Sequence, residues 1–315
     1  MISRAAGATI GAMHRLIALL ILFAVNVAQV WTDPATKQFH NPGCPHITAA
    51  MTRMPAAAAR AQGYTPAADC AKLAALTAAP PVTAREPEPD DGTIRVLFIG
   101  NSLTFYNELP WMVETLARSR GVRIKTVFEG FSGADLKQQW ERGRALQQIR
   151  EHRWTWVVLQ DRSTAGTLEP DELREYARRF DAEIRARGAK TMLFLTWTHR
   201  NDPRGQVAIT GAYRRAGAEL HAAVAPVGVL WERLLPRIQL FDDSGVHPNV
   251  TGTYLAACVF VAMLTGQNPN GLQHRFDAHY AIAEAYRQSL EHDTIDANDA
   301  EAIQRAAWEA VHAHG

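Results

Sequence analysis

A serine and a histidine in the central part of the chain are the residue types that acyl-transfer chemistry needs. Ser102 follows the apolar run IRVLFIG, and His247 lies in the polar stretch FDDSGVHPN far downstream. A serine hydroxyl becomes a nucleophile when an imidazole removes its proton, and a nearby carboxylate can fix the tautomer of that imidazole. Asp242 and Asp243 both stand just upstream of the histidine. These residue types predict a serine nucleophile with a histidine base.

Other residues could stabilise the negative charge that forms when an ester carbonyl is attacked. Gly133 lies in EGFSGADL, where a bare backbone N–H can approach a ligand, and Gln160 in VVLQDRS carries a side-chain amide. The N–H of Ser102 is a further donor, because it opens the turn into a helix. Taken alone, each residue is equally typical of a turn or a helix cap. Their joint occurrence after successive apolar runs favours one oxyanion-binding site.

The apolar runs before these residues have the composition of buried strands. They lie at 93–100, 122–130, 154–160, 190–197 and, more weakly, 224–231. Helical patterns alternate with them near 108–119, 134–151, 170–187, 205–222 and 249–265. Strands that alternate with helices predict a parallel sheet covered on both faces, with ligands at the carboxyl ends of the strands. The candidate residues all fall at that edge.

Four blocks of the sequence, FIGNSLTF, GFSGADL, VVLQDRS and HPNVTGTYLAA, resemble the ordered motifs of the Ser-Gly-Asn-His (SGNH, GDSL-like) hydrolase family. The resemblance runs from about residue 94 to 265. It implies an α/β fold, a three-layer α/β/α sandwich around a flavodoxin-like parallel sheet. Members are mostly esterases, lipases and carbohydrate deacetylases. By position, Ser102 resembles the nucleophile and His247 the general base, while Ser102 N–H, Gly133 N–H and the Gln160 amide resemble the oxyanion hole.

The sequence departs from the family pattern at two positions. The third block usually has asparagine where this chain has Gln160, which keeps the amide donor but adds a methylene group. The acidic residue usually lies three positions before the histidine, where this chain has Ser244. Three alternatives follow: Asp243 serves, Asp242 serves, or the enzyme uses a Ser-His dyad. We favour Asp243.

The predicted function is a serine ester hydrolase that acts through an acyl-enzyme on a small or carbohydrate-linked acyl ester. No cofactor and no metal are expected. An acyltransferase of the same fold uses the same serine chemistry, and an inactive envelope-binding protein is a further alternative. Ser132 and Ser163 are weaker candidates for the nucleophile. Ser132 is not in a Gly-x-Ser-x-Gly elbow and is adjacent to Gly133, and Ser163 follows the third strand but lies deeper in a loop. His199, in LTWTHRNDP, could line the pocket.

Composition bounds the remaining function classes. Hydrophobic residues make up 47% of the chain and charged residues 21%, with a net charge of +1. These values are ordinary for a globular protein, and they give no support for a nucleic-acid partner. Of the three cysteines, Cys44 and Cys70 could pair, and Cys258 is expected to be buried.

The N-terminal part differs in composition from the rest. Residues 1–31 contain a short apolar stretch behind basic residues, which is typical of a signal peptide or a membrane anchor. We therefore expect export to the periplasm or the medium, with membrane contact only through an uncleaved N-terminal segment. An Ala/Pro-rich extension and linker follow at 32–92, the hydrolase domain at 93–270, and C-terminal helices that pack on it at 271–315. Oligomeric state stays open.

Overall fold

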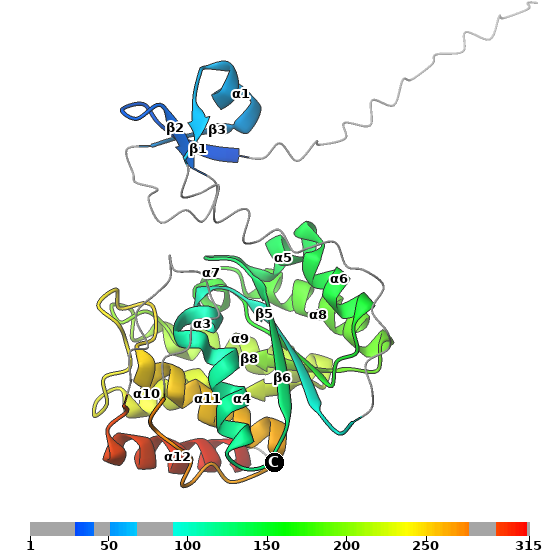
Figure 1. Ribbon diagram of the computed structural model, residues 1–315, viewed down its shortest axis with the longest axis vertical. Coiled ribbons are helices and arrows are strands. Elements are labelled where there is room, and N and C mark those ends of the chain that lie inside the picture. Colours follow the sequence, from blue (N-terminus) through cyan, green and yellow to red (C-terminus); the bar gives the residue numbers. More distant parts are fainter. Residues whose placement is uncertain (1–28, 41–50, 68–90, 277–293, 314–315) are drawn as a thin grey trace, which may run out of the picture. The chain divides into compact units, whose positions relative to one another are not determined.

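The computed structural model describes residues 29–40, 51–67, 91–276 and 294–313 (Figure 1). The chain divides into two compact units, Met1–Thr77 and Ala78–Gly315. The second unit carries every candidate site residue. Cys44 and Cys70 lie outside the described residues, so their predicted pairing stays a prediction.

The described part of the first unit is a small β-sheet with one helix. Its elements are β1 (Gln29–Asp33), β2 (Gln38–His40), β3 (Thr52–Pro55), α1 (Ala56–Ala61) and β4 (Thr65–Pro66), with the strand order β3-β1-β2-β4. Val30, Phe39 and Ala59 form its buried core. Strand β1 begins at Gln29, so Gln29–Trp31 belong to this sheet, although the sequence placed them in the N-terminal apolar segment. An ordered sheet also stands where an Ala/Pro-rich extension was expected.

The second unit is built on a parallel sheet in the order β6-β5-β7-β8-β9. Its strands are β5 (Ile94–Gly100), β6 (Ile124–Gly130), β7 (Trp156–Leu159), β8 (Lys190–Phe194) and β9 (Ala223–Ala225). Neighbouring strands are paired in parallel throughout, for example Val96 with Thr126 and with Trp156. Strand β5 therefore lies between β6 and β7, and the loops after these three strands meet at one edge.

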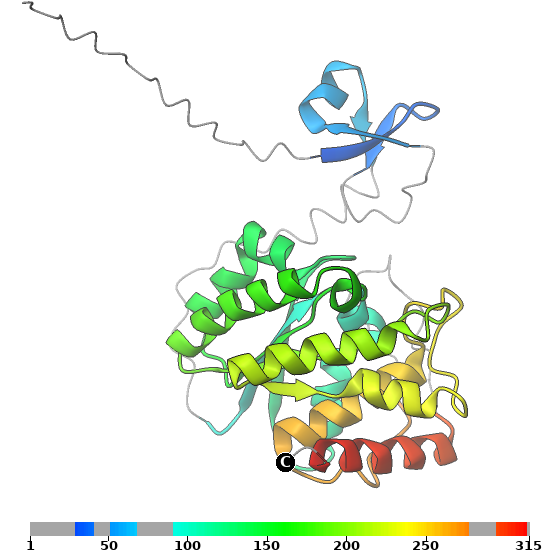
Figure 2. The ribbon, with the colours of Figure 1, turned by 180° about the vertical axis from the view of Figure 1, so that it is seen from behind.

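Helices cover both faces of this sheet and form the outer layers (Figures 1 and 2). The helical elements are α3 (Ser102–Phe105), η1 (Tyr106–Glu108), α4 (Leu109–Arg118), α5 (Leu136–Arg142), α6 (Arg144–Glu151), α7 (Ala165–Leu168), α8 (Pro170–Ala186), α9 (Gly205–Leu220), α10 (Val227–Leu234), α11 (Val250–Thr265) and α12 (Ala297–His312). The three-layer α/β/α sandwich predicted from the sequence is confirmed.

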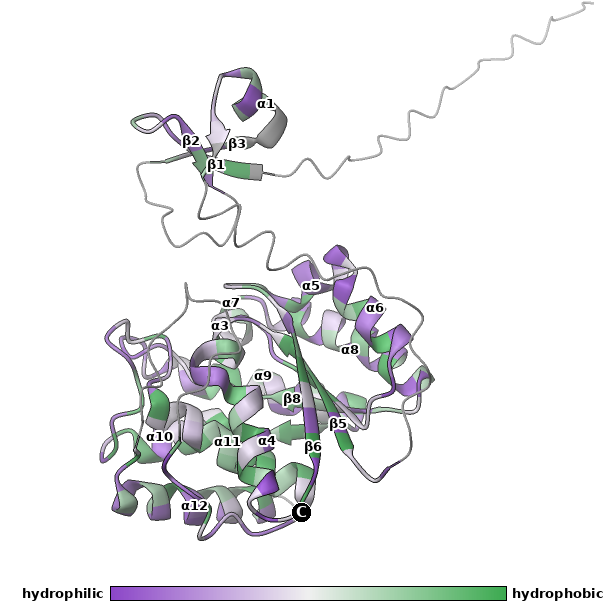
Figure 3. Ribbon diagram, in the orientation of Figure 1, coloured by the Kyte–Doolittle hydropathy of each residue, from purple (hydrophilic) through white to green (hydrophobic). Residues whose placement is uncertain are grey.

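Alternation along the strands explains why the sheet reads as continuous apolar runs. Val96 and Phe98 of β5 pack with α4, α10, α11 and α12 on one face. Leu97 and Ile99 pack with α5, α6, α8 and α9 on the other. Successive side chains of a strand point to opposite faces, so a sheet buried on both sides needs apolar residues at every position. Figure 3 shows apolar residues gathered on the sheet and along the helices beside it.

Two predicted elements differ from the structure. The run 224–231 was expected as a strand, but β9 ends at Ala225 and helix α10 begins at Val227. Pro226 stands between them and cannot donate to a strand ladder. The helix expected at 134–151 is divided into α5 and α6 by Gly143, whose φ of 77° lies in the left-handed region.

The C-terminal part carries one described helix, α12, whose Ile303 and Ala307 belong to the same core as α11. A second helix was expected between 271 and the end, and residues 277–293 lie outside the described part. Cys258 is fully buried in α11, as expected for a small hydrophobic residue. None of the described helices is long and apolar enough to cross a membrane.

Candidate active site

Ser102 is presented by a tight turn between β5 and α3. Only glycine fits at position 100, because a Cβ there would lie 2.5 Å from Gln160 Oε1 and 2.7 Å from Thr104 Oγ1. Asn101 caps the short helix, since its Oδ1 accepts the Leu103 N–H at 3.0 Å. The turn leaves the Ser102 N–H in the first helical turn, and no hydrogen bond within the described residues uses it.

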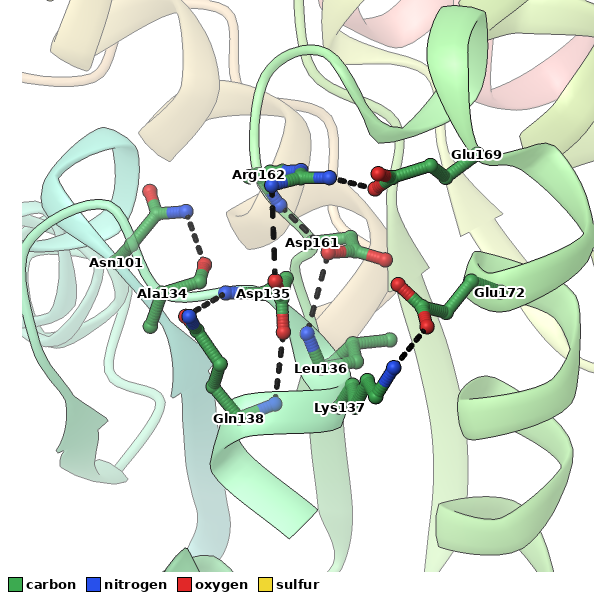
Figure 4. Close-up of polar contacts among 10 residues, drawn as sticks. All are labelled: Asn101, Ala134, Asp135, Leu136, Lys137, Gln138, Asp161, Arg162, Glu169 and Glu172. Carbon is green, nitrogen blue, oxygen red and sulfur yellow. Dashed lines mark hydrogen bonds and ion pairs between the residues drawn. The ribbon is translucent and has the colours of Figure 1, made fainter. Parts of the chain in front are cut away.

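The loop after β6 is attached directly to this turn. Asn101 Nδ2 donates to the Ala134 carbonyl at 2.7 Å, as Figure 4 shows. Gly133, next to this carbonyl, has a φ of 69° and lies in open space. Its N–H donates to no acceptor among the described residues. The structure thus brings the Gly133 loop beside the Ser102 turn, as expected for two oxyanion donors.

Gln160 is hydrogen-bonded to the turn that presents Ser102. Its Oε1 accepts the Asn101 N–H at 2.9 Å and the Thr104 hydroxyl at 2.8 Å, and its Nε2 donates to the Asp161 carbonyl. The side chain is only 1% exposed. The sequence placed Gln160 as an oxyanion donor; in the structure its carbonyl holds the turn, and one of its amide hydrogens is directed at the backbone.

His247 lies beside the serine, as the sequence predicted. Its Nε2 is 3.0 Å from Ser102 Oγ, across 145 positions of sequence. The ring of Tyr106, in the segment that follows α3, stacks on the imidazole at a centroid distance of 4.0 Å and an interplanar angle of 6°. Tyr106 was not identified from the sequence. The feature that could have indicated it is an aromatic residue four positions after Ser102.

The other side of the imidazole faces a hydroxyl group. His247 Nδ1 is 3.3 Å from Ser244 Oγ, and this Oγ is also hydrogen-bonded to the carboxylate of Asp242. The Ser244 N–H donates to the same Asp242 oxygen at 3.0 Å. Asp243, which the sequence favoured, makes no hydrogen bond to the histidine among the described residues. The structure instead connects Asp242 to His247, through Ser244.

Contacts from other elements hold the histidine loop in place. The Trp197 Nε1–H donates to the Val246 carbonyl at 3.0 Å, and the Arg200 N–H donates to the Gly245 carbonyl at 2.8 Å. Asn107 donates to the Pro248 carbonyl at 2.9 Å. The loop is thus attached both to the end of β8 and to the segment after the nucleophile. Trp197 is itself buried and stacks on Trp231, so it packs in the core.

The electrostatic environment suits His247 as a base. Burial lowers the pKa of His247 from its ordinary value of 6.5, the Asp242 carboxylate opposes this shift, and His199 adds to it. The imidazole is therefore neutral at pH 7. A neutral imidazole with Nε2 unprotonated can accept the Ser102 proton.

A second hydroxyl-imidazole pair lies at the ends of β7 and β8. His199 Nε2 is 2.7 Å from Ser163 Oγ. His199 is near enough to His247 to affect its pKa. The pair therefore lies close to the site. Ser163 is the alternative candidate for the nucleophile, and an experiment must distinguish it from Ser102.

The described residues hold no cluster of three or more side chains that could bind a metal ion. Around one point the site offers a hydroxyl, an imidazole and two backbone N–H groups that meet no acceptor among the described residues.

Comparison with solved structures gives likenesses at the level of fold. A DUF4886 family protein from Bacteroides uniformis ATCC 8492 is 18% identical, with a TM-score of 0.52 over 70% of this chain and 95% of that one. A protein proposed to be an SGNH hydrolase, from Slackia heliotrinireducens, is 23% identical, with a TM-score of 0.47 over 54% and 97%. Axe2, an acetylxylan esterase from Geobacillus stearothermophilus, is 16% identical, with a TM-score of 0.47 over 55% and 94%. No protein-family model and no curated protein matches the sequence.

The likeness to the DUF4886 family protein shows a shared fold. In this chain that fold has a parallel sheet in the order β6-β5-β7-β8-β9, with Ser102 after β5 and His247 just before helix α11. At these identities the likeness extends to the fold, and the activity has to be argued from the site itself.

Proposed function

We propose that the protein is a serine ester hydrolase, with Ser102 as the nucleophile and His247 as the general base. The observation that carries this proposal is the 3.0 Å contact between Ser102 Oγ and His247 Nε2. A contact of this length is a hydrogen bond in which the imidazole can accept the hydroxyl proton. The N–H groups of Ser102 and Gly133 beside it, which meet no acceptor among the described residues, support the proposal because they can bind a developing oxyanion.

The reaction proceeds in two steps. His247 Nε2 accepts the proton of Ser102 as its Oγ attacks the ester carbonyl carbon, and the carbonyl oxygen becomes an oxyanion. When this tetrahedral intermediate collapses, the bond to the alcohol oxygen breaks and the alcohol leaves with the proton from His247. Water then attacks the acyl-enzyme with the same base, which releases the acid and restores Ser102.

Gln160 contributes by supporting the turn that presents the nucleophile. Its Oε1 satisfies two buried donors at that turn, Asn101 N–H and Thr104 O–H. The substrate is proposed to be a small or carbohydrate-linked acyl ester, and the protein is proposed to act after export. Both proposals rest on the sequence: the export signal expected in residues 1–31 and the family resemblance.

The test is covalent labelling with a fluorescent alkyl phosphonate, which reacts with activated serines. We expect labelling at Ser102, found by peptide mass spectrometry, together with turnover of p-nitrophenyl acetate. Ser102→Ala should abolish both. Ser163→Ala is the matched control and should keep both, although Ser163 also contacts a histidine.

Three outcomes would contradict the proposal. Labelling that persists in Ser102→Ala and disappears in Ser163→Ala would move the nucleophile to the other pair. A folded protein that neither labels nor turns over any ester from acetate to decanoate would favour a binding protein. Transfer of the acyl group to an added sugar in preference to water would favour the acyltransferase.

A further inference from the structure

The carboxylate that assists His247 reaches it through a second serine. Ser244 occupies the space between the imidazole and the acid: its Oγ is 3.3 Å from His247 Nδ1 and is hydrogen-bonded to Asp242 Oδ1. The same Oγ accepts the backbone N–H groups of Val246 and His247, each at 3.1 Å. The hydroxyl is therefore held in one position by four partners.

Counting protons fixes the direction of each hydrogen bond. An ionised carboxylate only accepts, so the single hydroxyl proton of Ser244 is donated to Asp242. Ser244 then has no proton left for the imidazole, and its oxygen can only accept from Nδ1. The 3.3 Å contact therefore favours the tautomer that carries its proton on Nδ1, which leaves Nε2 free to accept from Ser102.

We propose that Asp242 and Ser244 act together as a relay that holds His247 in its reactive tautomer and stabilises the imidazolium. The proposal rests on the serine hydrolase function and extends it from two residues to a chain of four. Asp242 and Ser244 are positioning residues, since neither touches the substrate. As His247 takes up the Ser102 proton, its Nδ1–H becomes a stronger donor. The Asp242 carboxylate polarises the Ser244 hydroxyl, so the Ser244 oxygen becomes a stronger acceptor for Nδ1–H, while the hydroxyl proton stays on Ser244.

The surroundings of Asp242 agree with this assignment. The loop closes on itself, because the Asp242 N–H donates to the His247 carbonyl at 3.0 Å. Arg200 donates from its guanidinium to the Asp242 backbone carbonyl at 2.6 Å, which fixes the main chain under the carboxylate. The charged or titratable groups whose influence reaches His247 are Asp242, which raises its pKa, and His199, which lowers it.

The experiment compares four full-length variants that all keep Ser102. Ser244→Ala removes the relaying hydroxyl. Asp242→Asn removes the charge but keeps an oxygen that accepts the Ser244 hydroxyl. The double variant Asp242→Asn/Ser244→Ala measures the coupling between the two positions. Asp243→Asn is the matched control, since it makes the same change at the neighbouring carboxylate. The readouts are kcat and KM for p-nitrophenyl acetate, the rate of phosphonate labelling, and kcat/KM against pH.

We expect Ser244→Ala and Asp242→Asn each to lower kcat by on the order of 10- to 100-fold with little change in KM, because only the transition state carries the imidazolium charge. The double variant should be no slower than Ser244→Ala alone, since the relay is already broken. In Asp242→Asn the acidic limb of the pH profile should move to lower pH, because the carboxylate that raises the His247 pKa is gone. Asp243→Asn should behave as the wild type.

The relay is overturned if the two single losses multiply in the double variant, or if Asp243→Asn is as slow as Asp242→Asn. It is also overturned if Asp242→Asn lowers kcat while the acidic limb of the kcat/KM–pH profile stays in place. A purely structural role of Asp242 would give that result. Failure of the proposed function would look different: the wild type itself would then not label at Ser102.

Discussion

At the scale of single residues, the imidazole of His247 is held on three sides. Ser102 and Ser244 bind its two nitrogens, and the ring of Tyr106 lies flat against it. A stacked aromatic ring fixes the plane in which the nitrogens point. Its negative face also attracts a cation, so it stabilises the imidazolium more than the neutral ring. Tyr106 should therefore contribute to the transition state as well as to geometry.

We predict that Tyr106→Leu lowers kcat for p-nitrophenyl acetate by about 3- to 30-fold, which corresponds to a cation–π interaction of roughly 0.5–2 kcal/mol. Tyr106→Phe is the matched control, because it keeps the stacked ring, and should lose less than Tyr106→Leu. Thermal unfolding of both variants shows whether the fold is kept. Equal losses in the two variants would show that the ring does not act on the imidazolium.

At the scale of elements, the sequence predicted the strands and the site edge better than the geometry of the loops. The runs that became β5, β7 and β8 are apolar at most successive positions, and this pattern favours a strand buried on both faces. Strand β6 lies at the edge of the sheet, and polar residues interrupt its apolar run. The weak run at 224–231 could be strand or helix; in the structure Pro226 ends the strand, and Val227, Leu230 and Trp231 of α10 pack in the core. Ser102 and His247 could be predicted as partners because each is a reactive residue type and each stands where the carboxyl ends of the strands are expected to meet. The sequence left Asp242 as one of three alternatives, because the local turn decides which of two adjacent carboxylates reaches Ser244.

The loops at this edge are tied together by a buried carboxylate. Asp161 Oδ1 accepts the Leu136 N–H at 3.1 Å and the Arg162 N–H at 2.7 Å, so it joins the end of β7 to the start of α5 (Figure 4). Burial raises the pKa of Asp161 from 3.8 to about 7, and the two N–H donors oppose the shift. The folded protein therefore penalises the ionised form, and this carboxyl group costs stability at high pH.

We predict that Asp161→Asn changes how stability depends on pH. In the unfolded chain Asp161 ionises near 3.8, but in the folded protein only near pH 7, so its ionisation lowers stability as pH rises from about 4 to about 7. Asparagine keeps an acceptor for both N–H groups and does not ionise. The stability of Asp161→Asn relative to the wild type should rise across this window, by at most about 4 kcal/mol, since one pKa unit corresponds to about 1.4 kcal/mol.

Urea unfolding at pH 4.5, 6 and 8 measures this difference. Asp171→Asn serves as the control, because it makes the same change at a carboxylate whose side chain is 90% exposed. A pH-independent difference for Asp161→Asn would mean that the carboxyl group is ionised throughout the range.

At the scale of the whole molecule, the two units have separate hydrophobic cores. Val30, Phe39 and Ala59 form the core of the first unit. The two large clusters on either side of the parallel sheet contain, among the described residues, only side chains of the second unit. The nucleophile, the base, the relay and their supporting contacts all lie between residues 100 and 253. A unit with its own core and a complete site should fold and react by itself.

We predict that a chain beginning at Ala78 keeps the proposed chemistry. It should unfold in one cooperative transition, and its rate of phosphonate labelling at Ser102 should lie within about threefold of the full-length rate, because all the described residues that contact His247 are kept. Ser102→Ala in the shortened chain is the control for non-specific labelling. A shortened chain that folds but labels more than tenfold slower would assign part of the site to the N-terminal unit. One that keeps its labelling but loses turnover of longer or sugar-linked esters would instead give that unit a role in substrate binding.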